Sequence, residues 1–168
     1  MLTVRDVQPG DAEAVVALLN PIIEAGCYTT FLTPFTTAYE RSFIENLPAR
    51  GHFLGAFEEG ELRGFQVATP LASYTPALEH VAEIGTYVSL DHQRWGISGQ
   101  LFRATLERAA ANGFGKLLAW VRADNPAGLG SYRKNGFRDV GVAKRHANIG
   151  GRYVDVVLLE YVRPEKGA

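Results

Sequence analysis

Seven consecutive residues, 93–99, have the composition of a turn that binds phosphate at the start of a helix. They read Gln-Arg-Trp-Gly-Ile-Ser-Gly, and apolar residues follow at helical spacing. Gly96, Ser98 and Gly99 are small, so a ligand can approach their backbone N–H groups closely. The first four N–H groups of a helix have no partner inside it, and the helix dipole adds partial positive charge there. Together with the cation of Arg94, these groups predict a diphosphate site.

Two familiar phosphate motifs do not describe this turn. No Lys-Ser or Lys-Thr pair follows the glycines, which excludes a Walker A loop, and the Gly-x-Gly-x-x-Gly fingerprint is also absent. Taken alone, an ordinary strand-to-helix turn explains residues 96–99 equally well. The surrounding elements must therefore decide between the two interpretations.

Hydrophobic spacing and turn residues predict those elements. Asp11 is placed to cap the first helix, and Thr37-x-x-Glu40 has the form of a capping box for the second. Gly85 lies inside a strand, where glycine often marks a bulge. The proline-containing residues 71–78 predict a loop. Strands are expected at 2–7, 52–58, 61–69, 82–90, 116–121, 137–142 and 153–161, and helices from 12, from 37, at 96–112 and at 126–135.

The predicted order, β-α-α-β-β-β-α-β-α-β-β, is that of one mixed α/β sheet domain over residues 1–168. No linker, repeat or low-complexity segment divides it. A polar, glycine-rich connection is expected between the last two strands.

Composition narrows the class of protein. A formal net charge of −1 gives no indication of binding to nucleic acid or to an anionic membrane. One cysteine, Cys27, excludes an internal disulfide and favours the cytoplasm. We expect no secretory signal and no transmembrane helix, because no run of 18 apolar residues is present. The histidines have no partners at metal-ligand spacing, so no metal site is expected.

The turn resembles the signature of the GNAT (Gcn5-related N-acetyltransferase) superfamily, Gln/Arg-x-x-Gly-x-Gly/Ala. Here it reads Gln93-x-x-Gly96-x-Ser98, and Ser98 departs from the usual Gly or Ala. Downstream, Asn125, Tyr132 and Asn135-Gly136-Phe137 are similar to the family's Asn…Tyr-x-x-x-Gly-Phe segment. Residues 150–156, residues 27–31 and Pro34 resemble the phosphinothricin N-acetyltransferase subgroup. The resemblance covers nearly the whole chain.

This resemblance implies a fold and a co-substrate. The fold is a single α/β (α+β) domain with a mixed, mostly antiparallel sheet, a bulged and splayed fourth strand, and helices on both faces. The co-substrate is acetyl-CoA, with direct acetyl transfer to an amine and no metal. The implied cofactor-binding residues are Tyr87, Val88, Ser89, Gln93, Arg94, Trp95, Gly96, Ile97, Ser98, Gly99, Asn125 and Tyr132.

Three residues are the candidates for catalysis. The backbone N–H of Val88 is the candidate to bond the thioester carbonyl, because a splayed strand leaves such groups free. Tyr132 is the candidate acid for the leaving thiolate, although packing alone also explains a tyrosine there. That proton transfer is uphill by about 2 kcal/mol from ordinary pKa values near 10 and 8.5. Glu83 is the candidate base, and an exposed strand carboxylate with no role is the alternative.

The acceptor pocket is expected from residues 28–35 and the 71–78 loop, with Tyr28, Phe31, Tyr74 and Glu83 as its substrate residues. Subgroup members tend to carry an arginine in that loop, suited to acidic substrates, and this chain has none there. Phosphinothricin and other amino acids are therefore doubtful acceptors, and a small-molecule primary amine is the prediction.

Two other functions stay open: a non-catalytic CoA-binding or regulatory domain, and acetylation of a protein N-terminus. The subgroup also implies a homodimer, for which the apolar residues 154–159 of the last strand are the candidate contact.

Overall fold

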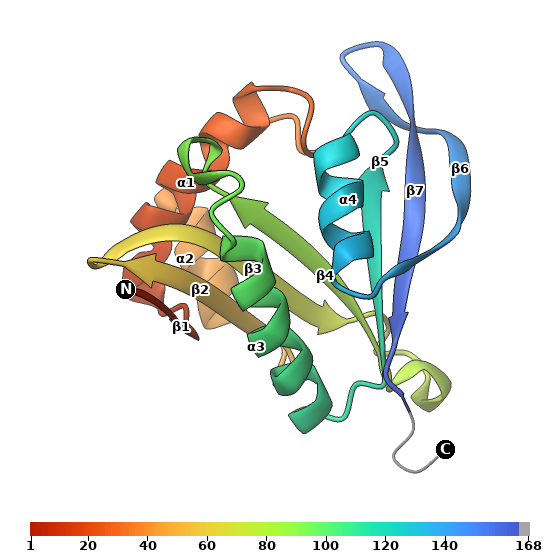
Figure 1. Ribbon diagram of the computed structural model, residues 1–168, viewed down its shortest axis with the longest axis horizontal. Helices are drawn as coiled ribbons and strands as arrows, with labels where there is room; N and C mark the ends of the chain where they lie inside the picture. The colour runs from red at the N-terminus through yellow and green to blue at the C-terminus, as the bar shows by residue number, and fades with distance from the viewer. Residues whose placement is uncertain (165–168) are drawn as a thin grey trace.

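A seven-stranded sheet runs through the described part of the computed structural model, residues 1–164 (Figure 1). The strand order is β1-β2-β3-β4-β5-β7-β6, and all neighbours are antiparallel except β4 and β5. The mixed, mostly antiparallel sheet confirms the predicted fold class. The strands are β1 (Leu2–Asp6), β2 (His52–Glu58), β3 (Glu61–Pro70), β4 (Val81–Val88), β5 (Lys116–Arg122), β6 (Arg138–Ile149) and β7 (Arg152–Val162).

Helices cover both faces of the sheet, as predicted. Helices α1 (Ala12–Glu24) and α2 (Thr37–Glu45) pack on one face, and α3 (Ile97–Ala111) and α4 (Pro126–Lys134) lie on the other, toward the viewer in Figure 1. Strand β2 shows why two faces are covered. Phe53 packs with the α1 side and Leu54 with the α3 side, because successive side chains of a strand point to opposite faces.

Strands β4 and β5 separate along their length, which confirms the predicted splay (Figure 1). They pair only at three positions, from Val81↔Lys116 to Glu83↔Leu118. The bulge predicted at Gly85 is absent from the ladder with β3, which runs in unbroken register from Gly64↔Val88 to Pro70↔Ala82. The irregularity lies instead on the β5 side, where pairing stops.

The ladder also fixes which backbone groups of β4 face the gap. Ser89 N–H donates to Arg63 O at 2.9 Å, and Leu71 N–H donates to Val81 O at 3.0 Å. Antiparallel ladders alternate, so the odd-numbered residues of β4 bond to β3. The N–H and C=O groups of Thr86 and Val88 therefore point into the gap between β4 and β5.

Three local predictions need correction. Strand β6 is much longer than the predicted 137–142, because residues 143–149 continue it up to a tight turn at Gly150 and Gly151, both with positive φ, while β7 closely matches the predicted 153–161. The α2 cap is Thr36, whose hydroxyl accepts from Tyr39 N–H at 3.2 Å, and not Thr37. The Asp11 carboxylate does not cap α1 and instead accepts from Gln8 N–H and Arg5.

Candidate active site

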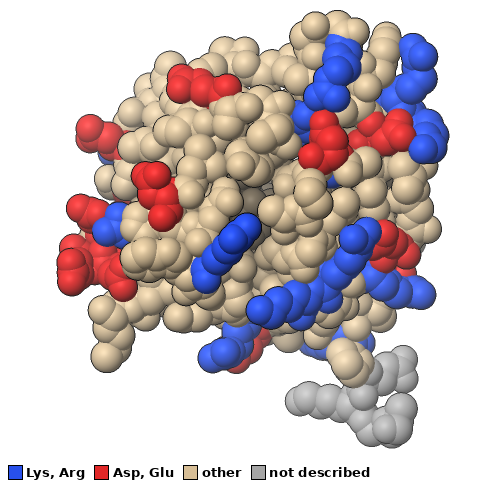
Figure 2. All heavy atoms as spheres, turned by 45° about the horizontal axis from the view of Figure 1, so that its top comes forward, with Lys and Arg blue, Asp and Glu red and all other residues tan. Residues whose placement is uncertain are grey.

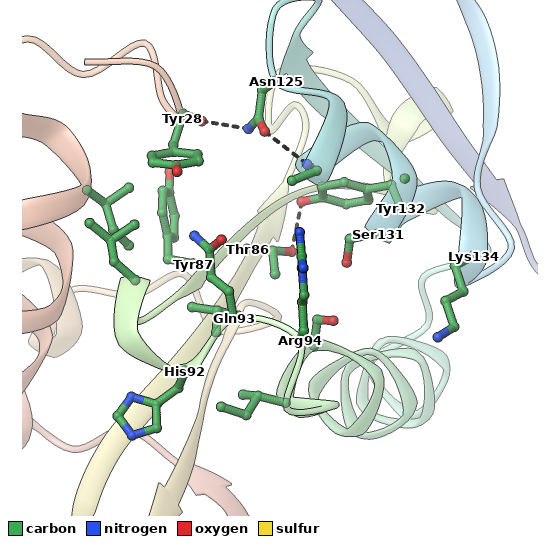
Figure 3. Close-up of a pocket in the computed structure, with 18 of the residues that line it drawn as sticks. Tyr28, Thr86, Tyr87, His92, Gln93, Arg94, Asn125, Ser131, Tyr132 and Lys134 are labelled. Carbon is green, nitrogen blue, oxygen red and sulfur yellow. Dashed lines mark hydrogen bonds between the residues drawn. The ribbon is translucent and has the colours of Figure 1, made fainter. Parts of the chain in front are cut away.

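A cavity of about 380 Å³ lies where β4 diverges from β5, between α3 and α4 (Figure 3). Its walls come from the end of β4, the turn before α3, and α4. Figure 3 shows Arg94 reaching from the turn toward Tyr132 on α4, and Gln93 lying beside Tyr87. We call it the donor cavity; it is lined by Ile22, Tyr28, Thr86, Tyr87, Val88, Leu90, His92, Gln93, Arg94, Gly96, Ile97, Ser98, Asn125, Ala127, Gly128, Gly130, Ser131, Tyr132 and Lys134.

The start of α3 presents its backbone to this cavity. Its N-cap is Gly96, which adopts the left-handed conformation at φ 78° and has no side chain to occupy the first N–H groups. Helix α4 contrasts with it, because the Asn125 side chain accepts from Gly128 N–H at 2.9 Å and caps that helix. A Cβ at Gly96 would meet nothing of the protein within 4 Å, so the space beside the cap is open.

The charge lining the donor cavity is positive. Arg94 and Lys134 line it, and none of its lining residues is Asp or Glu. Figure 2 shows Lys and Arg side chains beside a central hollow. A cationic wall next to free helix N–H groups suits a phosphate-bearing ligand.

The Tyr132 hydroxyl is buried at the inner end of the donor cavity. It lies 2.8 Å from Thr86 Oγ1 and donates to Ile84 O at 3.4 Å. Burial raises the pKa of Tyr132 well above its ordinary value of 10, against the opposing hydrogen bond with Thr86. Gln66, fully buried on β3, donates to Thr86 Oγ1 at 2.9 Å. Tyr132 is therefore held protonated in a fixed place.

A second cavity, of about 320 Å³, adjoins the first. We call it the acceptor cavity. The two share six wall residues: Tyr28, Thr86, Tyr87, Asn125, Gly128 and Tyr132. The remaining lining residues of the acceptor cavity are Thr29, Thr30, Phe31, Phe43, Val67, Thr69, Glu83, Ile84, Gly85, Trp120, Val121 and Arg122. A ligand in one cavity thus meets a ligand in the other at Thr86 and Tyr132.

Glu83 is the carboxylate of the acceptor cavity. Glu83 is exposed on β4, as an ordinary strand carboxylate would be. Partial desolvation still raises the pKa of Glu83, and a hydrogen bond with Trp120 lowers it in part. Its charge also contributes to raising the pKa of Tyr87, which burial mainly takes to about 12. Glu83 is thus a stronger base than an ordinary glutamate.

Arg122 holds the wall of the acceptor cavity together. It is 1% exposed, and its Nε and Nη2 groups both donate to Asp124 at 2.8 Å. Its Nη1 group donates to the carbonyls of Gly26 and Thr29. These bonds tie the loop after α1 to β5 and bring Tyr28 and Phe31 to the cavity.

Four residues expected in the site line neither cavity. Gly99 lies in the first turn of α3, Ser89 donates its N–H to β3, and Trp95 is 65% exposed with its ring against His92. Tyr74 is 84% exposed, and no residue of the 71–78 loop lines the acceptor cavity. The other predicted residues do line one or both cavities.

The sequence interpretation missed Thr86, Lys134, Trp120 and Arg122. The sequence did indicate Thr86 as a site residue, because it lies two residues before Val88 and therefore shares its orientation on the strand. The other three had no such indication, since they reach the site only through the crossing of α4 and β5 with the rest of the fold.

Two kinds of feature are absent from residues 1–164. No three His, Cys, Asp or Glu side chains gather as a metal-binding group there, and no helix in that part of the chain is long and apolar enough to cross a membrane.

Comparison with known proteins places this geometry in context. A family described as "Acetyltransferase (GNAT) family" matches residues 22–137. The chain is 23% identical over 163 residues to an L-methionine sulfoximine/L-methionine sulfone acetyltransferase of Pseudomonas aeruginosa, covering 94% of this chain and 92% of the relative. It is 34% identical over 100 residues to the N-alpha-acetyltransferase RimI of Mycobacterium tuberculosis, covering 60% of each.

Among solved structures, the fold matches a GNAT superfamily phosphinothricin acetyltransferase from Sinorhizobium meliloti in complex with AcCoA. The TM-score is 0.87 at 21% identity, over 99% of this chain and 95% of that one.

Proposed function

The chain belongs to the GNAT acetyltransferase family, and from that premise we propose that it transfers an acetyl group from acetyl-CoA to a primary amine of a small molecule. One observation carries the proposal: a cationic donor cavity and an acceptor cavity with a carboxylate adjoin at Tyr132 and Thr86. The similarity to an acetyltransferase named for L-methionine sulfoximine and L-methionine sulfone supports a small-molecule acceptor with a primary amine.

The donor cavity has the groups that acetyl-CoA requires. The uncapped N–H groups at Ile97 and Ser98, with the charge of Arg94, fit its diphosphate. Ser98 keeps its N–H, so its departure from Gly or Ala leaves this feature intact. When bound, acetyl-CoA supplies an activated acetyl thioester. The Val88 N–H, directed into the gap between β4 and β5, is placed to donate to an oxygen that gains negative charge.

Glu83 acts as the base for the incoming amine. An amine of pKa near 10 is mostly protonated at pH 7, and neutralising it costs about 4 kcal/mol. The raised pKa of Glu83 makes it a better proton acceptor at that pH, directly or through water.

Tyr132 holds the proton for the leaving thiolate. Its raised pKa keeps the hydroxyl protonated, and Thr86 fixes the position of its oxygen. The same raised pKa makes complete transfer less favourable than for an ordinary tyrosine. Hydrogen bonding to developing negative charge on sulfur is therefore the larger part of its contribution.

The test is release of free thiol from acetyl-CoA in the presence of a panel of primary amines. Amine-dependent release is expected. A protein that binds CoA tightly yet releases no thiol with any amine would be the non-catalytic domain instead.

Acetylation of a protein N-terminus is the second candidate, favoured by the similarity to RimI. Peptides with free N-termini belong in the same panel. Peptides acetylated more efficiently than every small amine would assign the chain to this second function.

A cytoplasmic homodimer is also part of the proposal. The strand that the sequence favoured for the contact is used inside the subunit, because Val154, Val156, Val157 and Leu159 are buried there. That expectation about the contact was wrong. The exposed Val140 and Val142 of edge strand β6 are the alternative, and light scattering of the purified protein measures the oligomeric state.

A further inference from the structure

We infer that the acceptor is a carboxylate-free amine with an aromatic or apolar body, and not an α-amino acid. This inference rests on the proposed function and deepens it. It follows from which charges line the acceptor cavity and which of them are already neutralised.

The acceptor cavity has one acid and one basic side chain, Glu83 and Arg122, among the residues that line it. Arg122 cannot serve a substrate anion as it stands. Its guanidinium is 1% exposed, both Nε and Nη2 donate to Asp124, and Nη1 donates to two carbonyls. The ion pair in turn holds the pKa of Asp124 down, at about 2.

A substrate carboxylate would have to displace Asp124 to reach this cation. The displaced carboxylate would keep a single ion pair with Arg152, which lies on the exposed side at 3.1 Å and lines neither cavity. The same guanidinium also donates from Nη1 to the carbonyls of Gly26 and Thr29, so moving it toward a substrate anion would disturb the cavity wall. The acceptor cavity thus offers an anion no unpaired cation among its lining residues.

Glu83 makes the same cavity favourable for a cation. Glu83 presents an exposed carboxylate to this cavity, so an approaching ammonium group is attracted to its negative charge. Phe31 and Trp120 are 40% and 43% exposed at the cavity, with one ring face of Trp120 stacked on His146 and one of Phe31 stacked on Tyr87. The ring surface that stays exposed suits an apolar body or the ammonium itself.

An α-amino acid carries its carboxylate on the carbon that bears its amine. Any amino acid whose amine reaches the shared wall at Tyr132 therefore brings a negative charge beside Glu83. Two like charges about 5 Å apart, at an effective dielectric constant of about 20, disfavour binding by a few hundredfold, and solvent around the exposed Glu83 reduces this toward about a hundredfold. Loss of the carboxylate removes that penalty and leaves the attraction of the ammonium.

The experiment compares matched pairs of acceptors that differ by the carboxylate, such as phenethylamine with phenylalanine and isoamylamine with leucine. L-Methionine sulfoximine and phosphinothricin complete the panel. We expect kcat/KM to be about a hundredfold higher for the amine of each pair. Equal or better acetylation of the amino acids would overturn the inference while leaving the proposed function intact. No thiol release with any acceptor would contradict the proposed function itself.

A variant locates the cause of the preference. Phe43, 37% exposed on α2, lines the acceptor cavity, and Phe43→Arg introduces a free cation there. We expect the amine-to-amino-acid ratio to fall at least tenfold in Phe43→Arg and to stay unchanged in the neutral control Phe43→Gln. An unchanged ratio in both variants would show that the preference does not arise from missing positive charge.

Discussion

The donor cavity takes its helix N–H groups and the cation of Arg94 from one short stretch of chain, residues 93–98, whereas the acceptor cavity is lined from six separate segments. The first uses backbone N–H groups and a cationic wall. The second uses aromatic rings and one carboxylate, with its guanidinium already paired. A cavity built from backbone tolerates change in most side chains, whereas one built from side chains changes its ligand with each substitution. This difference suits a constant donor and a variable acceptor.

The largest effect is expected at the wall that both cavities share, where a substitution should affect catalysis and not the binding of either ligand. Tyr132→Phe keeps the ring that packs on Phe102 and Phe137 but removes the hydroxyl. We expect kcat to fall about a hundredfold with the KM for acetyl-CoA nearly unchanged, the usual scale for loss of a general acid. Steady-state kinetics with varied acetyl-CoA measures both. A rise in KM with an unaltered kcat would reduce Tyr132 to a packing residue.

The acceptor side alone is tested at Glu83. Because its pKa is raised, the base form is lost as pH falls through that raised pKa, and kcat/KM for the amine falls with it. Glu83→Gln should lower kcat/KM by tenfold or more at pH 7 and flatten this acid limb. The measurement is a pH profile of both proteins. An acid limb that survives in the variant would assign the base to another group.

The donor side alone is tested at Gly96. Its φ of 78° is unfavourable for any residue with a Cβ, and a side chain there would occupy the open space beside the helix N-terminus. Gly96→Val should raise the KM for acetyl-CoA about tenfold and change the amine preference little. Gly99→Ala is the matched control, because Gly99 lines neither cavity and a Cβ there meets nothing within 4 Å. Equal KM values for acetyl-CoA in the two variants would show that the N-terminus of α3 does not bind the diphosphate.

The smallest expected effect on activity is at His52, which lines neither cavity. Its titration instead makes the stability of the fold depend on pH. It is buried, its two ring nitrogens have no partner, and burial lowers its pKa from 6.5 to about 4. Between pH 6.5 and pH 4 the unfolded chain therefore protonates His52, while the folded protein keeps it neutral. This contribution to the free energy of unfolding is complete above pH 6.5 and is lost as pH falls toward 4. The loss amounts to about 3 kcal/mol.

His52→Leu should remove this loss while leaving kcat unchanged at pH 7. Urea unfolding at pH 7.5 and pH 4.5 compares the two proteins. An identical loss of stability at pH 4.5 in the variant would place the cause elsewhere. The comparison also separates an acid limb due to Glu83 from one due to unfolding.

The residues by themselves predicted the element order and the helix start at residues 96–98, whereas the splay of β4 was implied by the resemblance to the GNAT superfamily. The first two depend on local patterns: alternation in a strand, spacing in a helix, and small residues where backbone must be exposed. The order of the strands had no such signal. It is set by pairing between residues far apart in the chain, as in β5 with β7.

Only the tertiary structure decided the acceptor cavity. Tyr74 seemed a suitable aromatic residue from its position in the chain, yet it lies 84% exposed outside the cavity, while Trp120 and Phe43 line it from β5 and α2. Nothing in the sequence distinguished Arg122, which follows the strand predicted at 116–121. Its bonds to Asp124 and to the carbonyls of Gly26 and Thr29 result from the way β5 meets the loop after α1. The physical reason is that helix caps and strand alternation are set by neighbours in sequence, whereas the charge of a cavity is the sum of side chains that only the packing of the whole fold brings together.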